Sequence, residues 1–293
     1  MTILSERIFE PYDGPRTGDL ARLAVIPRYA YAELFRSKMA LVVFASGFVI
    51  PAAWALMIYL HHNADALMSL NIRIDELMAI DAAFFIRLLF LQSGVGFFLA
   101  LIAGPPLIAR DLQNNALPLY LARPLTRAEY VGAKLAVLVG PLSAVTWIPG
   151  LLLFGFQAAL EPGWAAENWR ILPAFFVGSW VWIVPVALFT LAVSAVARRR
   201  TVARAGMLGL VFVSRGVAEA VNGMLNTKWG YLLSPTQLYD AMWTSLFGPD
   251  AEGGFFGSYA QLPSANVAWI TAAILTAAFV LVLSRRLRPW EDR

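Results

Sequence analysis

The stretch from Ile171 to Ala197 reads ILPAFFVGSWVWIVPVALFTLAVSAVA and contains no charged residue. An α-helix crosses the hydrocarbon layer of a bilayer in about 20 mostly apolar residues, because each residue advances the helix by about 1.5 Å. This stretch is therefore long enough and apolar enough to span a membrane. Three arginines follow it directly, Arg198, Arg199 and Arg200, and indicate where the chain leaves the lipid.

Five further stretches qualify as spans, so the sequence predicts an all-α, polytopic membrane protein with six transmembrane helices. The predicted spans cover residues 39–60, 82–109, 135–156, 171–197, 205–225 and 267–283. Continuous apolar runs of this length lack the alternation that the strands of a membrane barrel need. We divide the chain into a cytoplasmic N-terminal tail, residues 1–26, and a six-span domain, residues 27–293.

Composition excludes several classes of function. Hydrophobic residues make up 59% of the chain and charged residues only 14%, whereas soluble domains carry about 25% charged residues. There is no cysteine, and the only two histidines, His61 and His62, are adjacent rather than spaced as metal ligands. Neither a GxxxxGK[S/T] phosphate loop nor a GxSxG nucleophile motif occurs. The sequence therefore predicts no catalytic residue, no metal site and no cofactor held by this chain.

The distribution of lysine and arginine predicts the orientation, because cytoplasmic loops carry an excess of these residues. Eighteen of the 23 lie in the N-terminal tail, in the loops after spans two and four, and at the C-terminal end. The opposite loops hold only Arg73, Arg170 and Lys228. We therefore expect a bacterial-type inner-membrane protein with both termini in the cytoplasm. The net charge of +4 then reflects topology and not a nucleic-acid partner.

The segment before span one, residues 27–38, predicts a short helix on the membrane surface. Its apolar arc consists of Ala30, Tyr31, Leu34 and Phe35. Glu33 and Arg36 lie on the opposite side, and Pro27 suits a first helical turn. Such a helix, leading straight into a span, is typical of an interfacial elbow. The polar residues before it lack the apolar core of a signal peptide, so we expect span one to stay as an anchor.

The loop after span two carries apolar residues between polar ones. Thr126 and Glu129 have the spacing of a capping box, which predicts a helix that begins at Thr126 and runs into span three. The apolar residues upstream are Leu117, Leu119, Tyr120 and Leu121. Because they meet no lipid in a cytoplasmic loop, they either dock into a groove of a partner protein or pack against the elbow helix.

The segment between spans five and six, residues 226–266, is too long for a simple connector. Ser234, Pro235 and Gln237 provide an N-cap, a first-turn proline and an N3 glutamine, so we expect a helix there. Its apolar stripe would be Leu238, Met242, Leu246 and Phe247. The stripe is too short to span, which predicts an external helical segment that dips into the outer leaflet or covers the outer mouth of the bundle.

Three patterns, in this order along the chain, resemble permeases of the ABC-type-two exporter superfamily. They are PRYAYAELFRSK at residues 27–38, the pair Arg110-Asp111 followed by LARPLTR at residues 121–127 with Tyr130 and Lys134, and Leu233-Ser234-Pro235. The resemblance implies a six-span subunit of an ATP-driven exporter, paired with a separate cytoplasmic ATPase that binds ATP and Mg²⁺. It also implies a dimer, either of two copies or with a sister permease.

The resemblance further implies that the elbow helix and the element after span two contact the ATPase. The corresponding candidates in this chain are Glu33, Arg36, Arg110, Asp111, Leu117, Leu119, Tyr120, Arg123, Pro124 and Arg127. The N-terminal tail, with EPYDGPR at residues 10–16, is longer than a minimal member needs, and the sequence does not identify its partner.

Arg215 and Glu219 are the charged residues inside span five. Arg215 lies about 15 Å into the predicted span, where an ionised arginine costs at least about 2.5–3.5 kcal/mol unless it is paired. Glu219 is one turn away and is the expected partner. The pair belongs either to the translocation path or dimer seam, or to the structure alone as a neutralised pair. The glycines of this span, Gly206, Gly209, Gly216 and Gly223, allow a neighbouring helix to approach.

Two other functions are compatible with the sequence. A secondary transporter driven by an ion gradient would favour carboxylates deep in several spans and an internal repeat, but only Glu219 is placed in this way and no repeat is seen. A membrane anchor or assembly subunit that transports nothing is the other alternative. The residues do not indicate a substrate.

Overall fold

The computed structural model describes residues 19–63, 65, 67, 69, 77–114, 116, 126–197, 199–248 and 264–287. This part of the chain is helical and contains no strand. Six helical stretches are long and apolar enough to cross a membrane: Lys38–His61, Ala82–Gln113, Arg127–Leu160, Ile171–Ala197, Arg200–Leu225 and Ala265–Arg286. The prediction of six spans is confirmed, and five of the six extend further than predicted at one or both ends.

Each of the first three spans consists of two helices with a short break between them. Span one is α2 (Lys38–Ser46) and α3 (Val49–His61), span two is α5 (Ala82–Ala103) and α6 (Pro105–Gln113), and span three is α8 (Arg127–Val145) and α9 (Trp147–Leu160). Spans four, five and six are the single helices α11 (Ile171–Ala197), α12 (Arg200–Leu225) and α14 (Ala265–Arg286). A short helix, α10 (Trp164–Glu167), precedes α11.

Prolines explain the breaks, because a proline removes the hydrogen bond to the carbonyl four residues earlier. Pro51 lies four residues after Gly47, where α2 ends. The freed Gly47 carbonyl accepts a hydrogen bond of 3.1 Å from Nε2 of Gln92 in span two. Pro149 likewise lies four residues after Val145, the last residue of α8. The neighbouring helix thus satisfies a backbone group that the proline releases in span one.

At the break in span two, α6 packs closely against span four. At Gly104 an added Cβ would lie 1.9 Å from Cγ2 of Thr190, so only glycine allows this approach. Beyond it, Oγ of Ser194 accepts hydrogen bonds from the backbone N–H groups of Ile108 and Ala109, at 3.2 and 2.9 Å. The same hydroxyl donates to the Pro105 carbonyl at 2.7 Å. A buried serine of α11 therefore caps the start of α6.

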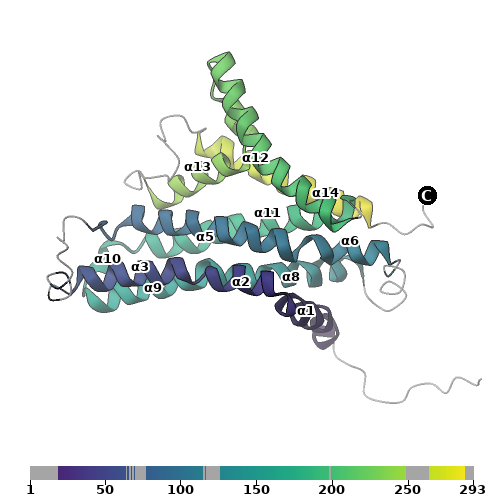
Figure 1. Ribbon diagram of the computed structural model, residues 1–293. Coiled ribbons are helices and arrows are strands. Elements are labelled where there is room, and N and C mark those ends of the chain that lie inside the picture. The colour runs from purple at the N-terminus through teal and green to yellow at the C-terminus, as the bar shows by residue number, and fades with distance from the viewer. Residues whose placement is uncertain are drawn as a thin grey trace, which may run out of the picture.

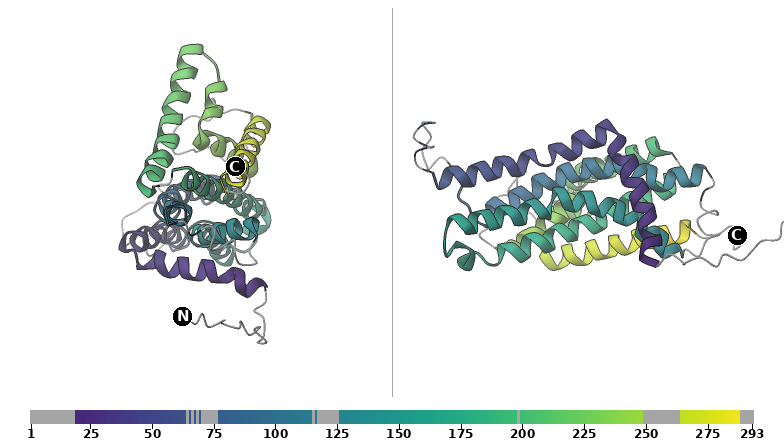
Figure 2. Two further views of the ribbon diagram at one scale, coloured as in Figure 1. Left: turned by 90° about the vertical axis from the view of Figure 1, so that its right-hand side faces the viewer. Right: turned by 90° about the horizontal axis from the view of Figure 1, so that it is seen from below.

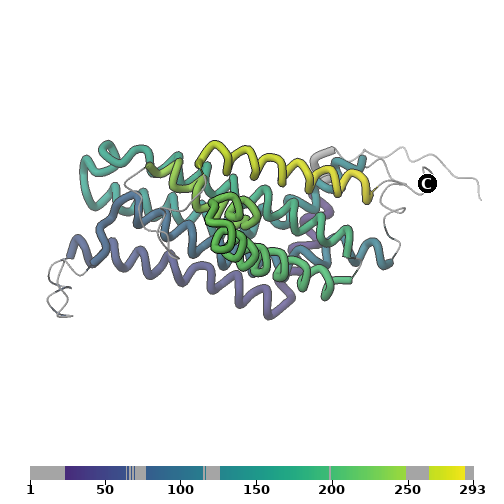
Figure 3. The backbone as a smooth tube through the Cα atoms, turned by 90° about the horizontal axis from the view of Figure 1, so that it is seen from above, coloured from purple at the N-terminus to yellow at the C-terminus, as the bar shows by residue number. Residues whose placement is uncertain are grey.

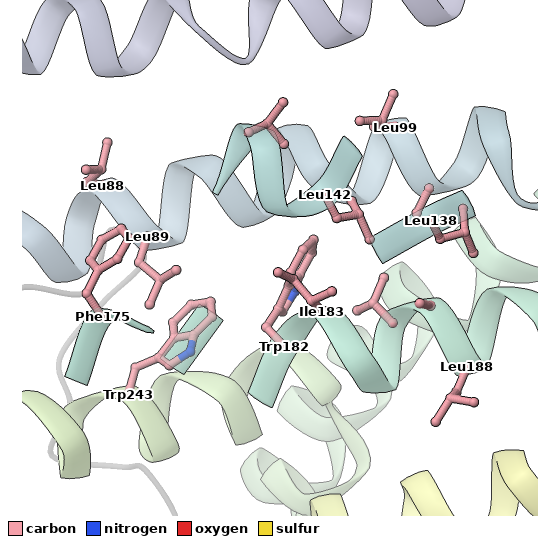
Figure 4. Packing of buried hydrophobic residues seen from close by; sticks show 14 of the residues in the cluster. Leu88, Leu89, Leu99, Leu138, Leu142, Phe175, Trp182, Ile183, Leu188 and Trp243 are labelled. Atoms are coloured by element: carbon pink, nitrogen blue, oxygen red, sulfur yellow. The ribbon is translucent and has the colours of Figure 1, made fainter. Parts of the chain in front are cut away.

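The core lies around α11, which contacts α5, α6, α8, α9, α12, α13 and α14. Figure 4 shows Trp182 of α11 pointing toward Leu142 of α8, and Phe175 beside Leu89 of α5. Trp243 comes from the helix α13 (Pro235–Phe247), and its Nε1 donates to the Gly178 carbonyl at 3.0 Å. The core thus fixes spans one to four together with α13 as one packed unit.

The N-terminal helix α1 (Asp19–Arg36) runs across the spans rather than along them (Figure 2). It begins inside the predicted tail, and Pro27 lies in its interior, so the prediction of a helix that starts at Pro27 is wrong. One missing hydrogen bond does not end a helix whose preceding residues, DLARLAVI at 19–26, favour helix. The face toward the bundle carries Tyr31, whose hydroxyl donates to the Ala136 carbonyl at 2.6 Å.

The segment between spans five and six contains a 3-10 helix (Trp229–Leu233) and α13. The expected helix and stripe are confirmed, with Leu238, Met242 and Phe247 buried. The expected side-chain cap is wrong, because the Ser234 hydroxyl bonds Thr236 Oγ1 at 3.0 Å instead of the backbone. Serine and threonine side chains compete for such local partners, so the spacing alone does not ensure a capping box.

Span five departs from the other helices. In Figure 1, α12 begins near α6, which it contacts, and its C-terminal half projects away from the bundle. Figure 3 looks down this projecting half from above. Only 11% of its most apolar window is buried, compared with 61% for α11. The apolar surface of α12 is therefore left for lipid or for another protein.

Candidate functional site

One end of the bundle brings together residues that the sequence placed in two separate elements. Glu33 of α1 and Arg110 of α6 form an ion pair between Oε1 and Nη1. Their side chains are 64% and 51% exposed. Ion pairs this exposed contribute little to stability, about 0–1 kcal/mol. The pair therefore joins α1 to α6 in a surface that stays open to a partner.

Asp111, the next residue, has a different environment. Its Oδ2 lies 2.8 Å from Nζ of Lys134 and accepts a hydrogen bond of 2.7 Å from the hydroxyl of Tyr130. The Asp111 and Lys134 side chains are only 15% and 8% exposed, and Tyr130 is 1% exposed. A nearly buried carboxylate with two internal partners holds α6 to α8. This geometry favours a positioning role for Asp111 over direct contact with another subunit.

The start of α8 is fixed by the predicted capping box, which is confirmed. Glu129 N–H donates to Oγ1 of Thr126 at 3.2 Å, and Thr126 N–H donates to Oε2 of Glu129 at 2.6 Å. The cap places Tyr130 one turn and Lys134 two turns into the helix, where both bond Asp111 of α6. The first turn of α8 therefore sets the position of the Asp111 network.

The other predicted coupling residues divide into two groups. Arg36 and Arg127 are exposed, at the end of α1 and the start of α8. Leu117, Leu119, Tyr120, Arg123 and Pro124 lie outside the described residues. The choice between a partner's groove and packing on α1 for the apolar loop residues thus stays a prediction.

The predicted pairing of Arg215 with Glu219 is confirmed. Nε of Arg215 lies 3.1 Å from Oε1 of Glu219, and the side chains are 33% and 56% exposed. Because α12 begins at Arg200, earlier than predicted, Arg215 lies about 22 Å along the helix instead of about 15 Å. Arg215 also lines an apolar cavity of about 290 Å³ between α5, α11, α12, α13 and α14.

Sequence reasoning missed Asp240 of α13, which lies on the side of that helix away from its apolar stripe. Burial raises the pKa of Asp240 from 3.8 to about 7, and the positive charge of Arg215 acts in the opposite direction. The signal was a lone carboxylate in a segment with few charges. Its arginine neighbour, however, comes from another helix and is visible only in the fold.

Sequence reasoning also missed two arginines as site residues. Arg200 and Arg204 served only to predict orientation, but both line a cavity of about 410 Å³ beside Glu33, Arg110 and Lys134. Their spacing of four residues places them on one face of α12. This spacing was the available signal.

The family model of ABC-2 family transporter proteins matches residues 31–288, from α1 to the end of the last span. The chain belongs to the ABC-2 transporter family. No curated protein sequence matched it. An ABC-2 permease is the membrane subunit of an ABC transporter, is not itself catalytic and pairs with an ABC ATPase. Family membership and the six spans together identify the chain as a multi-pass membrane transport protein.

Proposed function

We propose that the chain is the permease half of an ABC exporter, driven by a separate cytoplasmic ATPase dimer that carries ATP and Mg²⁺. The ATPase contacts the end of the bundle formed by α1 and α6, and both termini lie on that side. The observation that carries the proposal is the Glu33–Arg110 ion pair. It links α1 and α6, the two elements that the resemblance assigns to ATPase contact, so that they form a single surface.

The bonds of α6 support its role in transmitting movement. Its start is bonded to α11 through Ser194, and its last turn is bonded to α8 through Asp111. A force on α1 or α6 therefore reaches spans three and four through hydrogen bonds and ion pairs. Packed helices of this kind move as rigid bodies when one of them is displaced.

Charge reversal tests the coupling surface, by which we mean the exposed surface of α1 and α6 around Glu33 and Arg110. The double variant Arg36→Glu with Arg110→Glu should co-purify with much less ATPase than the unchanged chain does. It should also stimulate ATP hydrolysis by the ATPase only weakly, because the charge of both exposed arginines is reversed. The bundle should stay folded, since neither side chain belongs to the core. Arg170→Glu, an exposed residue near the opposite end, is the control. Normal hydrolysis by the double variant, or a chain that purifies without any ATPase, would refute the proposal.

The second permease copy is proposed to pack on α12. Gly209, Gly216 and Gly223 are spaced by seven residues, and a Cβ added at any of them would meet nothing within 4 Å in the described part of the chain. Large apolar side chains beside them, such as Val213 and Phe212, are 62% and 63% exposed. Small residues next to exposed apolar ones favour close packing of two membrane helices.

The absence of cysteine from the chain makes a direct test of this seam possible. A single cysteine in place of Val213 should form a cross-linked dimer in membranes under mild oxidation. A single cysteine in place of Leu152, which is 70% exposed on α9, is the control and should stay monomeric. Cross-linking at Leu152 but not at Val213 would place the seam elsewhere.

A further inference from the structure

The cavity beside the coupling surface has an uneven lining. It occupies about 410 Å³ between α1, α5, α6, α8 and α12. Its apolar wall includes Ile26, Leu34, Ile102 and Val137. Its charged residues are Glu33, Arg110, Asp111, Lys134, Arg200 and Arg204. A ligand that fits this cavity combines an anionic group with an apolar part.

The charges of this cavity do not balance. Arg110 is paired with Glu33, and Lys134 with Asp111. Among the described residues, no carboxylate lies within ion-pair distance of Arg200 or Arg204. Two positive charges are therefore left in excess, both on one face of α12.

Arg204 has unused hydrogen-bond donors. Its Nη2 donates to the Ile102 carbonyl at 3.5 Å, which is at the long limit of a hydrogen bond. Its Nε is buried and has no acceptor among the described residues. A buried donor without an acceptor is costly, and a guanidinium binds a phosphate through two parallel hydrogen bonds. Arg204 is thus suited to an anion that the described residues do not supply.

We propose that this cavity binds the phosphate of an anionic phospholipid from the cytoplasmic leaflet, with Arg200 and Arg204 as ligands and the acyl chains along the apolar wall. The apolar wall favours a lipid over a soluble anion, and basic pockets between membrane helices bind anionic headgroups. A zwitterionic lipid would bring its own positive group against two arginines. The choice of leaflet rests on the proposed orientation.

The bound lipid has a consequence for transport. It joins α12, the span whose apolar window is the least buried of the six, to α1 and α6 at the coupling surface. The content of anionic lipid in the membrane would then set how firmly α12 follows the movement of α6. This effect does not require the lipid to be the substrate.

The test compares two variants that each lose two arginines near the same end of the bundle. They are Arg200→Gln with Arg204→Gln, and Arg285→Gln with Arg286→Gln at the end of α14 as the control. Binding of labelled phosphatidylglycerol and phosphatidylcholine to the full chain is measured in nanodiscs or by native mass spectrometry. At about 1 kcal/mol for each arginine, the first variant should bind phosphatidylglycerol about tenfold to thirtyfold more weakly, and the control should match the unchanged protein.

Three outcomes would overturn the proposal: equal phosphatidylglycerol binding by both variants, equal binding of the two lipids, or full displacement of the lipid by inorganic phosphate, which would indicate a free-anion site. Co-purification of the ATPase with the same variants is measured in parallel. Loss of the ATPase with unchanged lipid binding would assign the arginines to the coupling surface and overturn the lipid site alone. A chain that binds phosphatidylglycerol through the arginines but never associates with an ATPase supports the lipid site and contradicts the proposed function.

Discussion

Replacing Lys134 with methionine tests whether the Asp111 network holds α6 to α8. The substitution removes the positive partner of a carboxylate whose side chain is 15% exposed. Breaking a buried ion pair costs about 3–5 kcal/mol when it leaves an uncompensated charge. Here the Tyr130 hydroxyl still donates to Asp111. Because this hydrogen bond leaves the carboxylate with one of its two partners, we expect a loss at or just below the lower end of that range, about 2–3 kcal/mol.

The double variant Lys134→Met with Asp111→Leu provides the control, because it removes both charges. It should be more stable than the single variant, and the two changes should be strongly non-additive. Unfolding in detergent, followed by tryptophan fluorescence during titration with denaturing detergent, measures both free energies. Additive losses, or a loss below about 0.5 kcal/mol for Lys134→Met, would refute the reasoning that the pair is a buried structural contact.

Ser194→Ala should cost about 1–3 kcal/mol of stability because it removes the hydroxyl that bonds two buried N–H groups and a carbonyl of α6, whereas Ser179→Ala, whose hydroxyl bonds only its own helix, should be close to neutral in the same assay. Gly150→Ala should destabilise by about 1–3 kcal/mol, since its Cβ would lie 2.0 Å from a buried aromatic ring of span four, and Gly155→Ala in open space is the control. Because its pKa is raised from 3.8 to about 7, Asp240 should make stability fall as pH rises through this range, and Asp240→Asn should abolish the slope in thermal unfolding measured from pH 4 to 8.

Long apolar stretches were predictable from the sequence, because a membrane span is decided by local composition alone. The six spans, the capping box at Thr126 and the pairing of Arg215 with Glu219 all depend on residues within one helix. The breaks after Gly47 and Val145 also depend on nearby residues, because each lies four residues before a proline, Pro51 or Pro149. A search that considers only the length of apolar stretches does not detect these breaks, because the proline lies inside the apolar stretch, four residues after the break that it causes.

Contacts between helices could not be predicted in the same way. Glu33 and Arg110 are 77 positions apart, and the residues between them include all of span one and most of span two. The same holds for Asp240 of α13, whose environment is set partly by Arg215 of span five. A pattern within one helix states which face is polar, but not which helix lies opposite. Site residues that depend on partners across the fold therefore required the structure.

The arrangement of contacts suggests why span five differs from its neighbours. α6 is held to α1, α11 and α8 by an ion pair, a serine cap and a buried network. The polar contacts of α12 include the long hydrogen bond from Arg204 to Ile102, the hydrogen bond between Asn222 and Gly230, and the interaction of Arg215 with Asp240 of α13, and none of these is a buried ion pair to another span. A helix held so weakly can change its position at low cost, whereas α6 cannot move without α8 and α11. Movement started at α6 would therefore carry the core as one body and change mainly the angle between that core and α12.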